Sequence, residues 1–376
     1  MRFLTSIIIT CATSILFPAP GFYVWQRVWT DDVVSAVREA EAEGRHLCIL
    51  AGELEREGAA WTWKRPNVPE HIWTNTQTTA VLRAPASAIN DPDALCDLLL
   101  REITSFKTPR VQLDIDVPER RLADYAKLLS KLRQPNLELS ATLLPAHLSR
   151  AEIAEVVKQL DYYVLQVHGI EAPRHRDDPY ALMRPDTTRR ALERAVALRH
   201  PFKVALPTYA YALTFDESGK FKRLYAEGFP GPTDGVKHRI TAPDFIQLLP
   251  VLQAGHDIIW FRLPVPSDRW TLDMSTLRLL EHGELPVPSV EITTSREDSK
   301  LTIYATFHHQ ITLSDATIPL NWTNTPPRGE FFPLNGTIFK PVPHGTLPTN
   351  ITVRAAACGR PTPVAFAILD DVRTRL

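Results

Sequence analysis

Short runs in which hydrophobic and polar residues alternate recur from about residue 22 to residue 283, separated by longer runs of helical period. Alternation with a period of two predicts strands, and hydrophobic residues at three- and four-residue spacing predict helices. The repeated order of strand and helix is typical of parallel βα proteins. The eight predicted strands are Phe22–Val28, His46–Glu53, Thr79–Ala84, Arg110–Val117, Leu137–Leu144, Tyr162–His168, Phe202–Tyr209 and Asp257–Leu263. Eight is the number that closes a (β/α)8 barrel, or TIM barrel.

The segments between these strands read as amphipathic helices. Thr30 is a candidate N-cap for the first of them, and a helix through Arg133 begins at Pro118, with proline in its first turn. The connection between Tyr211 and Arg239 fits neither pattern, because it is long and rich in Gly, Pro and charged residues. A connection of this kind is typical of a functional lid or of a disordered insert.

The pattern changes after Leu285. Short alternating runs are now separated by Asp, Asn, Gly and Pro, with no helical period, which predicts an antiparallel β-sandwich. The length of 376 residues accommodates a barrel of about 250 residues and a second domain of about 90. We therefore expect a targeting segment at 1–19, a barrel at 20–285 and a β-sandwich at 286–376.

The first residues resemble a targeting segment. Arg2 precedes the mostly apolar run Phe3–Phe17, which has the length of a signal peptide and is too short to span a bilayer. This pattern favours export to the periplasm or the extracellular space, and a buried core strand is the alternative. Cys11 adds the option of a lipoprotein, although Ile8-Ile9-Thr10 before it is a poor lipobox. A membrane partner is expected only if Cys11 is lipidated.

Composition narrows the class of protein mainly by exclusion. The net charge of -1 gives no reason to expect a nucleic-acid partner. The cysteines show no C-x-x-C spacing, so neither a disulfide framework nor a zinc site is predicted. Phosphate-binding glycine loops, G-x-S-x-G elbows and H-E-x-x-H motifs are all missing from the sequence. No cofactor and no metal are expected.

The segment Val111–Glu119, at the end of the fourth predicted strand, contains the candidate catalytic residues. Active sites of (β/α)8 barrels lie where the strands end. Alternation puts Gln112, Asp114 and Asp116 on one face, and the apolar residues between them must face the helices. Two carboxyl groups this close hold one proton more tightly, which suits acid catalysis. We predict Asp114, Asp116 and Glu119 as catalytic; the alternatives are a helix cap for Asp116 and a dipole partner for Glu119.

Other polar and aromatic residues at predicted strand ends form a candidate substrate pocket. Tryptophan can stack on the apolar face of a sugar, and amide, imidazole and phenol groups can bind its hydroxyls. The predicted substrate-binding residues are Trp25, Arg27, Glu53, Gln166, His168, Tyr209, Trp260 and Arg262, with Arg83 and Tyr211 beside them. The alternatives are that the two tryptophans fill the barrel and that His168 makes a structural hydrogen bond.

Three segments together resemble a bacterial family of exported proteins that is named only as a domain of unknown function. These segments are Tyr23–Trp29, Leu113–Glu119 with Tyr125, and Leu165–Gly169. The resemblance extends from about residue 22 to residue 263. It implies a fold and carries no activity with it.

Asp114-Ile115-Asp116 is also similar, more distantly, to the D-x-x-D-x-D-x-E signature of chitinase-type glycosidases. This similarity implies a glycosidase-like barrel. Val111 stands where the first Asp of the signature belongs, and Pro118 stands where its catalytic Glu belongs. The catalytic acid of that family therefore has no counterpart in this chain.

The leading hypothesis is a glycoside-hydrolase-like protein that acts on or binds an extracytoplasmic glycan. Asp116 serves in it as the acid or as the nucleophile-side carboxylate, with Asp114 as its electrostatic partner and Glu53 or Glu119 as other possible second carboxyl groups. The alternative is a non-catalytic carbohydrate-binding or scaffolding protein that has lost the acid. A third hypothesis is a metal-assisted hydrolase that uses Asp114, Asp116 and His168.

Overall fold

The computed structural model describes residues 19–58, 60–75, 77–169, 172–178, 181–226, 238–241, 243, 245–268 and 271–285. Farther along, it describes the backbone of six strands between residues 290 and 370. The predicted targeting segment with Cys11 lies outside the described residues.

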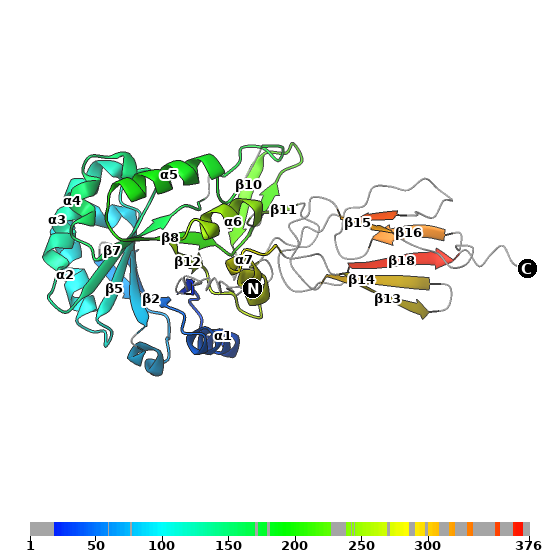
Figure 1. Ribbon diagram of the computed structural model, residues 1–376, viewed down its shortest axis with the longest axis horizontal. Coiled ribbons are helices and arrows are strands. Elements are labelled where there is room, and N and C mark those ends of the chain that lie inside the picture. The colour runs from blue at the N-terminus through cyan, green and yellow to red at the C-terminus, as the bar shows by residue number, and fades with distance from the viewer. Residues whose placement is uncertain are drawn as a thin grey trace, which may run out of the picture.

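Eight parallel strands close into a barrel (Figure 1). Each strand pairs with its neighbour in the order β1, β2, β4, β5, β6, β7, β8, β12, and β12 pairs again with β1. The strands are β1 (Gly21–Val24), β2 (Leu47–Glu57), β4 (Thr78–Ala84), β5 (Arg110–Ile115), β6 (Glu138–Leu143), β7 (Tyr162–Gln166), β8 (Phe202–Pro207) and β12 (Asp257–Phe261). All eight predicted strands are confirmed, with ends that differ by a few residues, and so is the (β/α)8 fold.

Helices cover the outside of this barrel (Figure 1). They are α1 (Asp31–Ala42), α2 (Pro92–Ile103), α3 (Leu122–Leu132), α4 (Ile153–Val157), α5 (Pro185–Ala197), α6 (Phe245–Gln253) and α7 (Met274–Glu281), with short 3-10 helices η1 (Glu70–Thr74), η2 (Ala86–Asn90), η3 (Glu119–Arg121) and η4 (His147–Ser149). The Thr30 hydroxyl accepts a hydrogen bond from the Val33 amide at the start of α1, as expected of an N-cap. Within the described residues, no helix is long and apolar enough to cross a bilayer.

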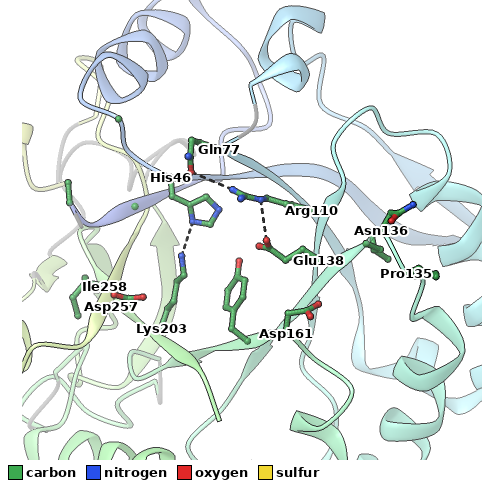
Figure 2. Close-up of a pocket in the computed structure, with 15 residues that line it drawn as sticks. His46, Gln77, Arg110, Pro135, Asn136, Glu138, Asp161, Lys203, Asp257 and Ile258 are labelled. Atoms are coloured by element: carbon green, nitrogen blue, oxygen red, sulfur yellow. Dashed lines mark hydrogen bonds and ion pairs between the residues drawn. The ribbon is translucent and has the colours of Figure 1, made fainter. Parts of the chain in front are cut away.

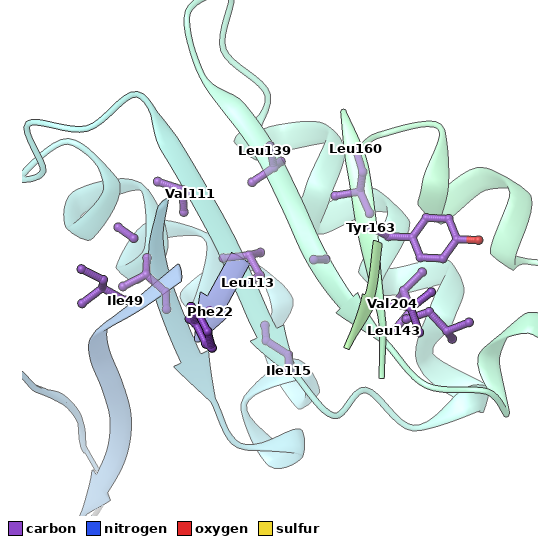
Figure 3. Close-up of a cluster of buried hydrophobic side chains, with 14 of the residues drawn as sticks. Phe22, Ile49, Val111, Leu113, Ile115, Leu139, Leu143, Leu160, Tyr163 and Val204 are labelled. Atoms are coloured by element: carbon purple, nitrogen blue, oxygen red, sulfur yellow. The ribbon is translucent and has the colours of Figure 1, made fainter. Parts of the chain in front are cut away.

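The side chains of each barrel strand alternate between two environments. On β5, Val111, Leu113 and Ile115 are buried against the helices, in the core shown in Figure 3. Full burial of each such side chain stabilises the fold by about 1.5–3 kcal/mol. Gln112 and Asp114 point to the other side, into the barrel, where Gln112 contacts side chains from β1 and β6. The predicted facing of this strand is confirmed.

The barrel closes where β1, at the start of the predicted barrel domain, pairs with β12, near its end, and we call this pairing the seam. The Phe22 amide donates to the His46 carbonyl at 2.8 Å, so β1 lies against the chain that leads into β2. Outside the strands, Arg45 donates to Glu281 at 2.7 Å, which ties the end of α1 to the end of α7. Arg278 of α7 adds an ion pair to Glu39 of α1 at 2.6 Å.

Two additions to the barrel were not predicted as strands. The end of β2 continues beyond the barrel and pairs antiparallel with β3 (Ala60–Lys64). The connection after β8 contains a three-stranded antiparallel sheet of β9 (Tyr211–Phe215), β10 (Phe221–Ala226) and β11 (His238–Thr241). The described part of the long connection is therefore an ordered sheet.

The strands beyond residue 285 are all antiparallel. A four-stranded sheet contains β13 (Val290–Glu297), β14 (Lys300–Phe307), β18 (Val364–Asp370) and β16 (Gly329–Pro333), and a two-stranded sheet contains β15 (Ala316–Pro319) and β17 (Asn350–Val353). The predicted change from a parallel barrel to antiparallel strands is confirmed. The boundary at residue 286 stays a prediction.

Candidate active site at the carboxyl end of the barrel

A cavity of about 330 Å³ opens where the barrel strands end. Eight of the eleven predicted site residues line it: Trp25, Arg27, Asp114, Asp116, Gln166, His168, Tyr209 and Arg262. The other lining residues are Tyr23, Arg83, Thr142, Gly169, Ala205, Tyr211, Ala226 and Phe261. The fourth predicted strand, now β5, thus delivers Asp114 and Asp116 to the cavity as its alternation predicted.

A polar layer inside the barrel supports the floor of this cavity. The Gln112 amide donates to the Tyr23 hydroxyl and, at 3.0 Å, to Thr142 Oγ1. Thr142 also hydrogen-bonds the carboxyl group of Asp114. Thr142 went unnoticed in the sequence, although it alternates with Ala141 and Leu143 and so belongs to the inward face of β6.

Asp114 is the more buried carboxyl group of the site, with 17% of its side chain exposed. Burial is the main cause that raises its pKa, and the negative charges of Asp116 and Glu53 raise it further. Arg83 and Thr142 act in the opposite direction, and the pKa settles at about 6. Asp116 is exposed at the mouth of the cavity. The two carboxyl groups therefore occupy different environments, which is the condition for two different roles in acid-base chemistry.

Glu53 lies between two arginines beside the cavity. Arg27 binds it through two hydrogen bonds of 2.5 and 2.8 Å, and Arg83 binds the same carboxylate at 3.1 Å. The Arg83 Nε lies 3.8 Å from Asp114 Oδ2, so one guanidinium bridges both carboxyl groups. Glu53 is absent from the lining itself. Its contacts make it a counter-ion that positions Arg27 and Arg83, rather than a group that meets a substrate.

Aromatic rings form one wall of the cavity. The rings of Trp25 and Phe261 lie 5.2 Å apart, and those of Tyr209 and Tyr211 lie 4.9 Å apart. The guanidinium of Arg83 lies 5.9 Å from the Trp25 ring. Phe261 was missed in the sequence, although it shares a strand face with Ile259, whose side chain fills the barrel interior. This wall offers flat apolar surfaces of the kind that pack against sugar rings.

One ring nitrogen of His168 is hydrogen-bonded, and the other is buried without a partner among the described residues. Its Nδ1 lies 2.9 Å from the Tyr209 hydroxyl, whereas its buried Nε2 has no hydrogen-bond partner among the described residues. Burial lowers the pKa of His168 to about 3, so the ring is neutral at physiological pH. The neutral imidazole therefore keeps one nitrogen without a partner just beneath the cavity surface, where a small shift of the side chain would let it hydrogen-bond a ligand.

Besides Glu53, two more predicted site residues, Trp260 and Glu119, lie outside the lining of the cavity, and their contacts do not support the roles predicted for them. Trp260 points outward from β12, is 0% exposed and donates through Nε1 to Glu281 at 2.7 Å. Its neighbours Ile259 and Phe261 take the inward positions. Glu119 begins η3, where its half-exposed side chain lies 3.9 Å from Arg150. The alternative interpretation of Glu119, as a residue of the first helical turn, describes its position.

Arg262 lines the cavity just beyond the end of β12. Its guanidinium pairs with Asp268, whose other oxygen accepts the Val265 amide at 2.9 Å.

The metal-assisted hypothesis fails on geometry, because Asp114, Asp116 and His168 are all described and do not form a group that could hold a metal ion.

Comparison with known proteins agrees with this fold. Residues 98–266 match a family described as "Domain of unknown function (DUF3142)", which confirms the resemblance to such a family. Among curated proteins, none matches the chain. The spore cortex-lytic enzyme SleL of Bacillus cereus superimposes with a TM-score of 0.51 at 14% identity, over 70% of this chain and 73% of that one. A chitinase of Chromobacterium violaceum superimposes with a TM-score of 0.49 at 12% identity, over 70% and 99%. At such identities, the likeness shows the barrel fold alone.

Proposed function

We propose that the cavity at the carboxyl end of the barrel binds a carbohydrate chain outside the cytoplasm and hydrolyses a glycosidic bond in it. The observation that carries this proposal is the pairing of Asp114, a buried carboxyl group with a pKa of about 6, with the exposed Asp116 beneath an aromatic wall. Glycoside hydrolysis commonly uses two carboxyl groups, one of which keeps a proton because its pKa is raised.

The two environments assign a role to each carboxyl group. Asp114 keeps its proton in mildly acidic solution and donates it to the oxygen of the leaving sugar. Asp116 is the second carboxyl group, which activates water or stabilises positive charge on the sugar ring. This reverses the roles expected from the sequence, because the buried member of the pair is Asp114. Glu53 is held by two arginines and Glu119 lies outside the cavity, so neither competes for the role of Asp116.

The remaining lining residues position the substrate. Trp25 and Phe261 stack on the apolar face of a sugar ring. His168 hydrogen-bonds a sugar hydroxyl through its unpartnered Nε2 after a small shift of its side chain, and Tyr209 holds the other ring nitrogen. Arg27 lies at the mouth of the cavity, where its guanidinium meets the ends of the bound chain.

The test is the release of reducing ends from a panel of polysaccharides that includes chitin, peptidoglycan, cellulose and xylan. We expect Asp114→Asn and Asp116→Asn each to lower the rate by about 100-fold or more. Glu119→Gln, a change outside the cavity, is the matched control and keeps the activity. Activity should also decline as the pH rises above about 6, because Asp114 then loses the proton that it donates. Full activity in the Asp114 or the Asp116 variant contradicts the mechanism.

A non-catalytic carbohydrate-binding protein is the second candidate, and one observation favours it. Pro118 occupies the position of the catalytic Glu in the chitinase-type signature, and the following Glu119 turns away from the cavity. Glycan-array binding without any release of reducing ends, even after long incubation, decides for this candidate. Binding should then depend on Trp25 and persist in Asp114→Asn.

The location outside the cytoplasm rests on the pattern of Arg2 and Phe3–Phe17 alone. We expect an antibody to detect the protein in periplasmic or secreted fractions, and mass spectrometry to show a shortened amino terminus. A full-length protein confined to the cytoplasmic fraction contradicts this part of the proposal.

A further inference from the structure

A second cavity, of about 740 Å³, opens at the opposite mouth of the barrel, where the strands begin (Figure 2). Residues at the starts of five strands contribute charged or polar side chains to its lining: His46, Arg110, Glu138, Lys203 and Asp257. This end of a (β/α)8 barrel normally serves stability alone. A charged cavity larger than the candidate active site is therefore unexpected here.

Three of the charged groups around this cavity have partners of their own: Arg110 and Glu138 pair with each other, and Asp161 pairs with Arg133 at 3.8 Å. The Arg110 Nε lies 3.3 Å from Glu138, and its guanidinium also reaches the Gln77 side chain at 3.5 Å. The Asp161 carboxylate accepts the Leu139 amide at 2.8 Å. These groups frame the cavity and leave little unbalanced charge.

Lys203 is different, because its charge is oriented but not neutralised. Its ammonium donates to His46 Nδ1 at 3.2 Å, the contact that a dashed line marks in Figure 2, and it lies 5.0 Å from the Tyr162 ring. Burial, followed by the charges of Lys203 and Arg110, lowers the pKa of His46 to about 3, so this imidazole stays neutral. The structure gives Lys203 no ion pair with any described carboxylate. A half-buried ammonium without a counter-charge is costly unless a ligand supplies one.

Asp257 supplies the complementary feature. It pairs in register with Lys203, on the neighbouring strand, so the two backbones lie about 4.8 Å apart. No ion pair joins the two side chains, and Asp257 makes none with another described residue. The Lys203 ammonium and the Asp257 carboxylate thus line one cavity side by side without forming an ion pair with each other.

We propose that this cavity binds a small zwitterion of the α-amino acid class, whose carboxylate pairs with Lys203 and whose ammonium pairs with Asp257. A simple anion would meet Glu138 and Asp257 as well as Lys203, and a simple cation would meet Lys203 and Arg110. A ligand that carries an ammonium and a carboxylate group on one carbon matches the neighbouring opposite charges of Lys203 and Asp257. The site is independent of the carbohydrate cavity at the other end of the barrel.

The experiment is a thermal-shift screen of the full chain against the twenty amino acids, followed by calorimetric Kd values for the ligand that stabilises it most. A ligand that binds the folded state alone raises Tm by mass action. The N-acetyl and the carboxamide derivatives of that ligand should each bind about ten-fold more weakly or worse, because each loses one charge-assisted contact.

Lys203→Met and Asp257→Asn should weaken binding of the free amino acid by a similar factor. Lys158→Met and Asp186→Asn, at exposed helix positions, are the matched controls and keep the affinity. Asp257→Asn also guards against misfolding, since Asp257 is exposed and makes no ion pair within the described structure. The proposal is overturned if no amino acid stabilises the chain, if the derivatives bind as well as the parent, or if folded Lys203→Met or Asp257→Asn keeps the affinity. Hydrolysis of polysaccharides should be unchanged in both variants.

Discussion

Asp114 holds its proton to a higher pH than an exposed aspartic acid because it is buried beside other acidic groups. The same burial that suits it for proton donation makes its ionised form unfavourable in the folded state. The folded pKa of about 6 exceeds the ordinary value of 3.8, so the native protein binds this proton more tightly than the unfolded chain does. The folded state therefore loses stability as the pH rises from about 4 through 6.

The expected consequence concerns Asp114→Asn, which removes the titrating group while keeping its shape. Relative to the wild type, the variant should gain about 2 kcal/mol in free energy of unfolding between pH 4 and pH 8. Urea denaturation of both proteins at the two pH values measures this difference. Asp186→Asn, at an exposed position on α5, is the control and should show no such gain. An equal response of wild type and Asp114→Asn to pH would contradict the burial of this charge.

Trp260 and Trp25 provide a second contrast at this scale. Trp260→Phe should lower the free energy of unfolding by about 1–3 kcal/mol, because it removes the bond to Glu281 and leaves a small cavity in the core. Carbohydrate binding should be unaffected. Trp25→Phe, in the cavity lining just after β1, should do the reverse and weaken binding with little loss of stability. Thermal unfolding and glycan-binding assays of the two variants separate these outcomes.

Single residues were predictable from the sequence where the strand alternation was unbroken. On β5, the interleaved Val111, Leu113 and Ile115 determined the facing of Asp114 without ambiguity. On β12, every residue from Ile258 to Phe261 is apolar, so hydrophobicity alone did not distinguish the inward face from the outward one. Trp260 was consequently assigned to the wrong face. The pairing of Glu53 with two arginines could not be predicted from the sequence, because it joins side chains from β2, from β4 and from the loop after β1.

The elements show a similar division. The barrel strands were predictable because each is buried on both faces and bounded by polar turns. The strand β3 and the end of β2 were not, since Glu55, Arg56 and Glu57 interrupt the hydrophobic pattern outside the barrel. The sheet of β9, β10 and β11 was hidden by the polar composition of its connection. Small sheets at the rim of the barrel are stabilised by backbone pairing, so the alternation of hydrophobic and polar residues that would predict them is weak.

The shortest barrel strand, β1, pairs with both β2 and β12, and at Gly21 its backbone closely approaches the residue that precedes β2. A Cβ at Gly21 would lie 2.6 Å from the His46 carbonyl oxygen, so Gly21→Ala must push two backbones apart. We expect a loss of about 1–3 kcal/mol in free energy of unfolding. Gly169→Ala is the control, because a Cβ there meets no atom within 4 Å. Equal Tm values for the two variants would show that the contact between β1 and His46, just before β2, tolerates widening.

At the scale of the whole molecule, the last helix of the barrel extends beyond the last residue matched by the family of unknown function. The match stops at residue 266, whereas α7 extends to Glu281. Glu281 accepts hydrogen bonds from both Arg45 and Trp260, so the last helix completes a polar contact that begins in the first βα unit. The functional barrel must therefore include α7.

Truncation tests this limit and the predicted domain boundary together. A chain that ends at residue 285 should unfold cooperatively and keep its carbohydrate binding. A chain that ends at residue 266 should not, because the buried Arg45 loses its partner Glu281, at a cost of about 3–5 kcal/mol, and the apolar face of α7 is gone. Circular dichroism during heating distinguishes the two. A cooperative transition in the shorter chain would show that α7 is dispensable.

The seam between β1 and β12 also determines when the ring can close during synthesis. The strand that leaves the ribosome first must wait for the strand that is made last, and Arg45 and Trp260 acquire their shared partner only once translation has passed Glu281. Until then, the nascent chain exposes two unpaired strand edges, which are surfaces prone to mispairing. The antiparallel strands β13 to β18 are still being translated when closure becomes possible. The speed of their translation therefore sets how long the ring has to close before the chain leaves the ribosome.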